Sequence, residues 1–239
     1  MTKREVADPW ERLSDPAPQR VALSPESISQ AALRLADAEG LSAVTMRSLA
    51  AHLGVAPMAI YRHAANKEDV VELMVNAVQS EMIPMKAEPI GWRSYLRSAA
   101  LHSRQAIIRH PWLLDVSPRA FLAPTPNGME RSEQMVSVLV DAGLSAPAAL
   151  DSANAVHAYA DGGAHAELAH REMLPDTQAR ERVTPGRKHA KRFQRLANGA
   201  DYPNLSLHDF SSVSDEVMNA RFELGLESLI DGIAYRFGI

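Results

Sequence analysis

The segment 42–67 constrains the fold of this chain of 239 residues more than any other. Thr45 suits the N-cap of a helix, because its hydroxyl can accept a hydrogen bond from a free backbone N–H in the first turn. Four apolar residues then recur at helical spacing and form one narrow face: Met46, Leu49, Ala50 and Leu53. Gly54 follows, where a helix C-terminus favours a residue that tolerates the left-handed conformation. The pattern predicts a short amphipathic helix that ends in a tight turn.

A second short helix is predicted directly after this turn. Pro57 fits a first helical turn, where its missing N–H would be unpaired in any case. Ile60 and Ala64 then face inward, and Asn66-Lys67 closes this helix and opens the next. The outward side chains are Met58, Ala59, Tyr61, Arg62 and His63. Two short helices around a glycine turn are the build of a helix-turn-helix, whose second helix enters the major groove of DNA.

The alternative is that these two helices simply pack within some all-helical domain. Arg47 and Ser48 lie off the apolar face of the first helix and can turn toward a phosphate or a base. Tyrosine followed by Arg-His and then Asn-Lys also suits phosphate contacts. These polar groups favour DNA binding over simple packing.

Residues 28–67 resemble the TetR (tetracycline repressor) family of bacterial transcription regulators. The matching motifs are Ala-Glu-Gly-Leu, Thr-Met-Arg-Ser-Leu-Ala, Leu-Gly-Val, Ile-Tyr-Arg-His and Asn-Lys. A looser similarity continues through Gly91-Trp92 and His110-Pro111-Trp112. It ends in Phe-Glu-Leu-Gly-Leu-Glu-Ser-Leu-Ile-Asp-Gly, which resembles the closing helix of the subgroup that contains the tetracycline repressors. The resemblance implies an all-α fold, with an N-terminal three-helix helix-turn-helix domain and a larger helical ligand-binding and dimerisation domain.

The resemblance also implies which residues contact DNA. Four of them, Thr45, Tyr61, His63 and Lys67, are expected mainly at phosphates. Arg47 is a candidate base reader, and a bidentate arginine–guanine contact contributes about 1–3 kcal/mol of discrimination. With the outward residues, the predicted DNA-contacting set is Thr45, Arg47, Ser48, Pro57, Met58, Ala59, Tyr61, Arg62, His63 and Lys67.

The start of the second helix differs from that of the tetracycline repressors. Those proteins read bases there with polar residues, whereas this chain has Pro57, Met58 and Ala59. These side chains can touch thymine methyl groups but offer no hydrogen bonds. We therefore do not expect the tetracycline operator to be the target.

The charge of the chain excludes a generic nucleic-acid coat protein. The net charge is −4, and residues 1–67 carry eight Lys or Arg against seven Asp or Glu. So mild an asymmetry argues against non-specific binding by bulk charge. The absence of cysteine excludes disulfides and thiol chemistry. The sequence has no apolar run of membrane-spanning length and no signal peptide at its start, so we expect a soluble, cytoplasmic protein.

Three parts are predicted along the chain. Residues 1–23, with Pro9, Pro16 and Pro18, are predicted to form a flexible arm. The alternatives are an arm without function and an arm whose basic residues reach a groove of DNA. Residues 24–70 form the DNA-binding domain, and 71–239 the ligand-binding and dimerisation domain. The first helix is expected to begin at Ser24-Pro25, ahead of the two short helices described above. The further helices expected are Lys67 to about Ile83, Trp92 to about His110, a short helix within 113–127, Gly128–Ala142, Ala146–Met173, a possible one at 186–198, and Asp215–Phe237.

Two of these helices are predicted to form a dimer interface. Ala153–Ala169 is rich in small residues and contains Gly162 and Gly163, and a mid-helix glycine costs roughly 1 kcal/mol against alanine. Close helix approach would offset that cost. The last helix has an apolar stripe of Phe222, Leu226, Leu229, Ile230 and Ile233. In the family these two helices pair across a two-fold axis; the alternative is burial within a monomer.

A ligand pocket is predicted on the helix from Trp92 to His110 and on the helices after it, because these enclose a cavity in the family. Its expected lining is Leu96, Ala99, His102, Ser103, Trp112, Phe121, Met135 and His157, although each could equally be ordinary core. Met129 and the aromatic residues suggest a largely apolar ligand. Tetracycline repressors hold a magnesium–drug complex through a loop histidine, and no histidine lies between Pro111 and Pro126, so tetracycline is not expected.

One histidine cluster allows a rival hypothesis. His157, Asp161 and His165 recur every four residues on one helix face and could ligate zinc in a metal-dependent enzyme. The alternative is that they are polar residues of the pocket wall or dimer seam. Without a second ligand cluster we predict no catalytic residue, metal or cofactor. The intact Tyr61–Lys67 segment argues against a third hypothesis, a helical interaction protein that has lost DNA binding. The favoured function is a homodimeric repressor released from a palindromic operator by a small molecule.

Overall fold

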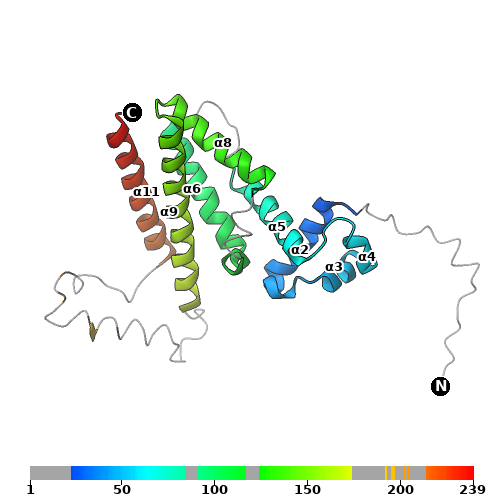
Figure 1. The fold of residues 1–239 in the computed structure, drawn as a ribbon. Coiled ribbons are helices and arrows are strands. Elements are labelled where there is room, and N and C mark those ends of the chain that lie inside the picture. The colour runs from blue at the N-terminus through cyan, green and yellow to red at the C-terminus, as the bar shows by residue number, and fades with distance from the viewer. Residues whose placement is uncertain are drawn as a thin grey trace, which may run out of the picture.

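The computed structural model describes residues 23–83, 91–116, 124–173 and 214–239, together with residues 192, 195, 196, 202 and 204. All regular elements in these ranges are helices, which confirms the all-α prediction (Figure 1). In chain order they are α2 (Pro25–Glu39), η1 (Leu41–Ala43), α3 (Met46–Leu53), α4 (Pro57–Ile60), α5 (Lys67–Glu81), α6 (Trp92–Arg109), η2 (Pro111–Asp115), α8 (Pro126–Asp141), α9 (Ala146–Met173) and α11 (Asp215–Phe237). The predicted arm apart from Leu23, the pocket residue Phe121 and most of the possible helix at 186–198 lie outside the described residues.

Helices α2, α3 and α4 form a three-helix unit at one end of the molecule (Figure 1). Ser24 caps α2 as expected, in a capping box where the Ser24 and Ser27 side chains each accept from the other's backbone N–H. Ile28 of α2, Leu49 of α3 and Ile60 of α4 are fully buried and pack into one core. Their apolar spacing is what folds three short helices around a common centre.

Helix α5 belongs to this core and also leads away from it. It packs against α2 on one side and against α8 on the other, with Val70, Met74 and Val78 fully buried. The same core continues into Ile107 of α6 and Trp112 of η2. The three-helix unit is therefore joined to the remainder of the chain by continuous apolar packing along α5.

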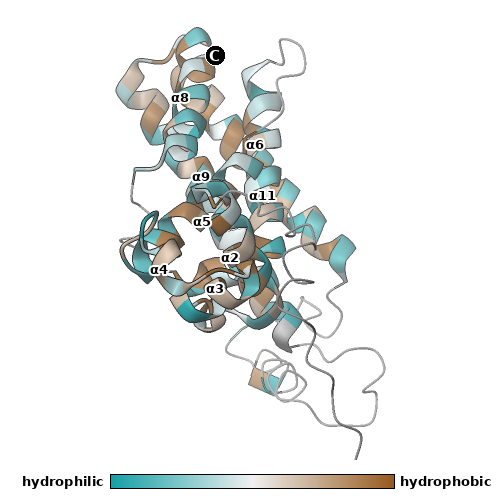
Figure 2. Ribbon diagram, turned by 90° about the vertical axis from the view of Figure 1, so that its right-hand side faces the viewer, coloured by the Kyte–Doolittle hydropathy of each residue, from teal (hydrophilic) through white to brown (hydrophobic). Residues whose placement is uncertain are grey.

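The other four long helices form a bundle with a second core, at the opposite end of the molecule (Figure 1). Its fully buried large side chains are Leu96 on α6, Met135 and Leu139 on α8, and Leu226 and Ile230 on α11. Hydrophobic and hydrophilic residues alternate along these helices, so each buries one stripe and exposes the other (Figure 2). No described helix is both long and apolar enough to span a bilayer.

The predicted use of the α11 stripe as a dimer surface is wrong. Phe222, Leu226, Ile230 and Ile233 are buried within this chain, at 0–7% exposure, and Leu229 is half-buried. α11 lies along α9, where the Tyr159 hydroxyl donates to the backbone oxygen of Phe222 at 2.9 Å. The alternative stated above, burial within the monomer, is the one the structure shows for these residues.

Close packing against α11 explains why one of the two mid-helix positions of α9, Gly163, holds a glycine. A Cβ at this position would lie 2.7 Å from Cδ2 of the Phe222 ring, closer than a Cβ can stand. A Cβ at Gly162 would meet nothing within 4 Å. Gly163 thus permits close approach of α9 and α11 within the chain, whereas Gly162 faces open space.

Most of the predicted helix bounds agree with the structure; the start of α8 and the end of α4 differ. α8 begins at Pro126 rather than Gly128, because the Thr125 side chain accepts from the backbone N–H of Gly128 and caps the helix earlier. The structure describes the 3-10 helix η2 at Pro111–Asp115, which follows α6 directly, whereas most of the segment in which a short helix was expected, residues 117–123, lies outside the described residues. Pro111 suits this first position because it needs no N–H partner there.

Candidate nucleic-acid interface and ligand core

The start of α3 is fixed by a capping box between Thr45 and Ser48. The Thr45 hydroxyl oxygen accepts from Ser48 N at 3.0 Å, and Ser48 Oγ accepts from Thr45 N at 2.9 Å. Ser48 Oγ also lies 2.7 Å from the backbone oxygen of Ala43, to which it donates. Thr45 is exposed, as its predicted role requires. Ser48 differs from expectation, since its half-buried hydroxyl is engaged in the cap rather than turned outward.

The turn after α3 has the predicted geometry. Gly54 adopts the left-handed conformation, with φ of +66°, and its N–H points back to the carbonyl oxygens of Ala50 and Ala51. Val55 N then donates to Ala50 O at 3.0 Å. These bonds satisfy the free carbonyl groups at the end of α3 and direct the chain into α4.

Helix α4 is shorter than predicted. It covers only Pro57–Ile60, and residues 61–63 form tight turns in which His63 N donates to Ile60 O at 2.8 Å. The expected continuation of this helix to Asn66 is wrong, whereas the expected opening of the next helix at Asn66-Lys67 is confirmed, since Asn66 caps α5. Its side chain accepts from Asp69 N at 2.8 Å, while the Asp69 carboxylate accepts from Ala65 N at 2.7 Å. These local bonds compete with further helical bonds.

The outer surface of this region carries the predicted DNA-contacting side chains. Ile60 and Ala64 are buried, as expected for inward residues. Met58 is 70% exposed and Tyr61 44% exposed. Arg47, Pro57, Arg62 and His63 are also exposed, and Ala59 is half-buried. α3 and α4 lie at the far end of the molecule from α9 and α11, so this surface is free of the helical bundle (Figure 1).

Lys67 has a structural partner that the sequence did not reveal. Its Nζ donates to the backbone oxygen of Leu41 at 3.0 Å, a contact between residues 26 positions apart. The ammonium group has three donor hydrogens, so two remain for an outside acceptor. Lys67 therefore ties η1 to the start of α5 while its charge stays near the surface of the three-helix unit.

The residues predicted to line the ligand pocket separate into two places. Leu96, Ala99 and Met135 pack together in the second core and are at most 1% exposed. Trp112 belongs to the first core, beside α2, so the structure does not bring it to these three residues. On α6, the Nδ1 of His102 is bonded to Ser98 O at 2.8 Å, whereas the buried Ser103 Oγ has no partner among the described residues.

His157 lies in a half-buried polar cluster with Arg131 of α8 and Asp161, one turn further along α9. Burial lowers the pKa of His157 to about 3, and the positive charge of Arg131 acts in the same direction. Burial also lowers the pKa of Arg131 and raises that of Asp161, while their mutual attraction opposes both shifts. Each therefore feels the other's charge inside the bundle. Sequence reasoning named His157 but missed Arg131, since nothing in the local pattern shows that an arginine of α8 lies beside a histidine of α9.

The side chains of His157, Asp161 and His165 are not arranged as the metal-site hypothesis requires. His165 is exposed and its Nδ1 is bonded to the backbone oxygen of Asp161 at 2.8 Å, while His157 is oriented into the bundle beside a cation. Within the described residues no three histidine, aspartate or glutamate side chains are grouped so that they could hold a metal ion.

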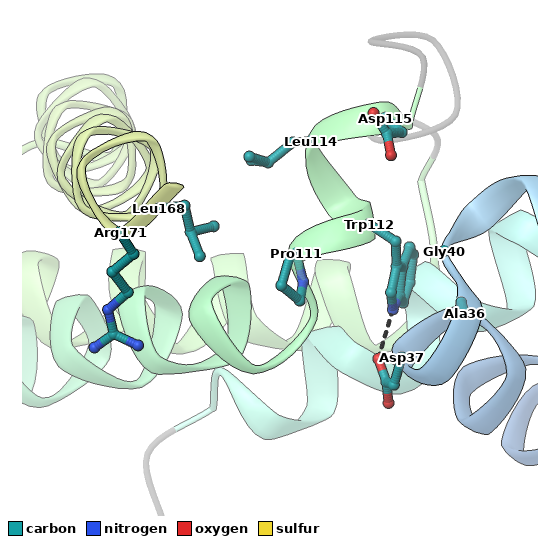
Figure 3. Close-up of a pocket in the computed structure, with 9 residues that line it drawn as sticks. All are labelled: Ala36, Asp37, Gly40, Pro111, Trp112, Leu114, Asp115, Leu168 and Arg171. Atoms are coloured by element: carbon teal, nitrogen blue, oxygen red, sulfur yellow. Dashed lines mark hydrogen bonds between the residues drawn. The ribbon is translucent and has the colours of Figure 1, made fainter. Parts of the chain in front are cut away.

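A pocket lies where the three-helix unit meets the bundle. It has a volume of about 570 Å³ and is lined by Ala36, Asp37, Gly40, Pro111, Trp112, Leu114, Asp115, Leu168 and Arg171 (Figure 3). Asp37 of α2 accepts from Trp112 Nε1 at 2.8 Å and is bonded to His110 Nδ1 at 2.7 Å. His110 Nε2 in turn lies 3.3 Å from Glu81 of α5. His110 thus joins α2, α5 and η2, although the sequence indicated it only as a helix end and as part of the family's His-Pro-Trp motif.

Two family models match the chain. Residues 28–74 match the bacterial regulatory proteins of the tetR family, and residues 84–237 match the tetracyclin repressor-like C-terminal domain. A transcriptional repressor of Streptomyces coeruleorubidus, DrrR1, is 29% identical over 220 residues, which are 88% of this chain and 77% of that protein. The class A tetracycline repressor of transposon 1721 from Escherichia coli is 28% identical, covering 90% of this chain and 92% of the repressor.

Solved structures show the same fold. The TetR family protein ActR of Streptomyces coelicolor, in complex with actinorhodin, superposes with a TM-score of 0.72 and 25% identity. The match covers 91% of this chain and 98% of ActR. Apo ActR gives a TM-score of 0.68, with 92% of this chain and all of ActR covered, at 24% identity.

Proposed function

This chain belongs to the TetR family of DNA-binding transcriptional regulators, which are not enzymes, and we propose that it acts as a homodimeric repressor released from a palindromic operator by a small molecule. The observation that carries the proposal is the outer surface of α3, α4 and the turn after them. There, exposed apolar, aromatic and basic side chains stand together at the end of the molecule remote from the bundle.

The proposed DNA contacts divide by chemistry. Thr45, Tyr61, His63 and Lys67 position the protein on phosphates, and Arg62 adds a further exposed cation. Arg47 reads a base edge, and Met58 with Pro57 contacts thymine methyl groups. Because Ser48 is held by its cap, it supports Thr45 rather than reaching a base itself. The relatives named as repressors support repression over activation.

The proposed dimer seam is the outer face of α9 and α11 rather than the buried stripe. On α9 the exposed residues at helical spacing are small: Ala158, Gly162, Ala166 and Ala169. On α11, Leu224 is 72% exposed and Tyr235 is 93% exposed, with Gly232 between them facing open space. Exposed apolar side chains beside small ones favour packing of helix on helix. Two copies would supply the two reading surfaces that a palindromic operator needs.

We propose that α5 links the DNA-binding part of the chain to the ligand-binding part. Residues 24–70 bind DNA, residues 71–239 bind the ligand and the second copy, and α5 carries movement between them because it packs on both α2 and α8. A ligand shifts such an equilibrium only by binding one arrangement more tightly than the other. The ActR complex with actinorhodin supports a small-molecule ligand for this fold. A cytoplasmic location follows from this role.

The experiment is a titration of the full-length protein against a palindromic fragment from its own promoter region. Saturable binding that weakens as salt rises is expected, because phosphate contacts release counterions. The double variant Tyr61→Ala with Arg62→Ala should lose most of this affinity. A matched control is the double variant Tyr202→Ala with Arg195→Ala, which removes the same two residue types from exposed positions outside both the reading surface and the proposed dimer seam. Equal affinity of wild type and the Tyr61/Arg62 variant would overturn the proposal.

A further inference from the structure

The pocket between the three-helix unit and the bundle lies apart from the second core. Its walls come from α2, from η2 and from the last turns of α9, so both ends of the molecule contribute to it (Figure 3). None of its lining residues belongs to the second core. Its volume of about 570 Å³ falls in the range of roughly 300–1,000 Å³ that is usual for sites of small organic ligands. The pocket therefore has room for a small molecule that touches α2 and α9 at once.

Asp37 contributes an oxygen atom that can accept from such a ligand. Its Oδ1 accepts from Trp112 Nε1 and is bonded to His110 Nδ1. Its Oδ2 takes part in none of the hydrogen bonds found among the described residues, and the side chain is 33% exposed. An ionised carboxylate accepts through both oxygens, so Oδ2 keeps its capacity for an outside donor.

The charged residues of the lining favour a positively charged ligand. Asp115 is exposed and takes part in none of the ion pairs found in the described ranges. Arg171, on the α9 side of the pocket, already faces two carboxylates. Its Nη2 donates to Glu167 at 2.7 Å and lies 3.8 Å from Asp215. The two aspartates of the lining thus stand against a single guanidinium that has its own partners, which leaves a local excess of negative charge.

The surface between these charged groups is apolar. Pro111 and Leu114 of η2 lie between Asp37 on one side and Leu168 of α9 on the other (Figure 3). Leu114 is 38% exposed and Leu168 is half-buried, so a ligand that covered them would remove apolar surface from water. A bare metal ion would leave this surface uncovered. The lining therefore favours an organic cation over a metal ion.

We propose that this pocket is a second small-molecule site, outside the bundle core, and that it binds an organic cation with an apolar body. The ammonium group of the ligand donates to Asp37 near the negative charge of Asp115, and the body covers Leu114 and Leu168. Because α2 and α9 both contact the ligand, binding biases the position of the DNA-binding end relative to the bundle. The site itself is independent of the proposed function, whereas this regulatory consequence rests on it.

The test is isothermal titration calorimetry of the full-length protein with three naphthalene probes of similar size. These are naphthylethylamine, naphthylethanol and naphthylacetate, which carry a positive, a neutral and a negative group on the same ring. The amine should bind about fivefold more tightly than the alcohol, the ratio expected for one partly exposed ion pair. The acetate should bind no better than the alcohol. No saturable heat with the amine, or equal affinity of the amine and either other probe, would overturn the inference.

Variants assign the preference to the pocket. Asp37→Asn keeps an oxygen for the Trp112 hydrogen bond but loses the charge, so it should remove most of the preference for the amine. Leu114→Lys places a competing ammonium group in the pocket and should abolish amine binding. Since Leu114 is exposed, this variant should fold even if Asp37→Asn does not. Asp141→Asn, the same loss of charge at an exposed position of α8 outside the pocket, is the matched control and should bind like wild type. Amine binding of wild-type strength in Leu114→Lys would overturn the inference.

Operator binding tests the regulatory consequence separately. With saturating naphthylethylamine, the affinity of wild type for the palindromic promoter fragment should change about fivefold or more. The Leu114→Lys variant in the same mixture should show no change, which excludes an effect of the amine on the DNA itself. An unchanged affinity of wild type would overturn the regulatory consequence and leave the binding site in place. If the amine binds but wild type binds no operator, the repressor proposal fails and the cation site stands.

Discussion

The indole nitrogen of Trp112 donates a 2.8 Å hydrogen bond to Asp37, and this bond joins η2 to the first helix of the three-helix unit. The same carboxylate oxygen is bonded to His110, which leads by way of Glu81 to α5. Asp37 thus adds a hydrogen-bonded link between the three-helix unit and the base of the bundle to the apolar packing along α5, beside the pocket of Figure 3.

Replacing Asp37 should therefore loosen this junction. Asp37→Ala leaves the buried donors of Trp112 and His110 unpartnered, and we expect a loss of about 1–3 kcal/mol in the free energy of unfolding. Urea unfolding followed by circular dichroism measures this loss. Asp115→Ala, at the same pocket but exposed, is the control and should change stability by less than about 0.5 kcal/mol. Equal effects of the two variants would show that the junction bonds contribute little.

The two neighbouring glycines of α9 should respond differently to alanine. Gly163→Ala forces the Phe222 ring to move, because the new Cβ would stand 2.7 Å from it, and overpacking of this kind costs about 1–3 kcal/mol. Gly162→Ala meets nothing within 4 Å in the chain and gains helix propensity. Thermal melts of both variants give the comparison. A Gly163→Ala variant as stable as wild type would mean that the α9–α11 contact adjusts freely.

The proposed seam predicts a change of oligomeric state. Leu224→Arg with Tyr235→Arg places two charges on the outer face of α11 without touching the core of the chain, since both side chains are exposed. We expect this variant to sediment as a monomer with its helical content intact and to bind a palindromic fragment more weakly. Val140→Arg, at an exposed apolar residue of α8, should remain dimeric. A double variant that stays dimeric would place the seam elsewhere.

His157 predicts a specific pH dependence of stability. Its pKa is about 3 in the folded protein against 6.5 for the free side chain, so the unfolded chain takes up this proton first as the pH falls. Stability that is present above pH 6.5 is therefore lost on acidification. Between pH 7 and 5.5 this single group should lower the free energy of unfolding by about 1 kcal/mol. His157→Leu lacks the group and should lose correspondingly less.

Urea midpoints of wild type and His157→Leu, compared across that pH range, check the expectation. The difference between the two proteins isolates His157 from other titrating groups, including Asp161, whose raised pKa acts in the opposite direction at lower pH. If the urea midpoints of the two proteins changed equally with pH, His157 would have the same pKa in the folded and the unfolded state, and the expectation would be wrong.

Sequence alone predicted those features that depend on neighbours a few residues apart. Thr45 caps α3, Gly54 turns the chain, and α9 and α11 begin and end where their patterns indicated, because caps and helical periodicity act over three or four residues. The family match rests on the same local motifs. One local prediction was wrong, since the helix that begins at Pro57 ends at Ile60 and residues 61–63 form turns, although Asn66-Lys67 opens α5 as expected.

Tertiary structure decided what depends on residues far apart in the chain. An apolar stripe fits a partner chain or the chain's own core equally well, and only the position of α9 against Phe222 showed which one buries it. Likewise, the hydrogen bonds from Lys67 to Leu41 and from Trp112 to Asp37 form only once the helices are packed, and so does the approach of Arg131 to His157. Helical periodicity specifies which face of a helix is buried, but the partner of that face is set by packing between distant segments, which no local pattern encodes.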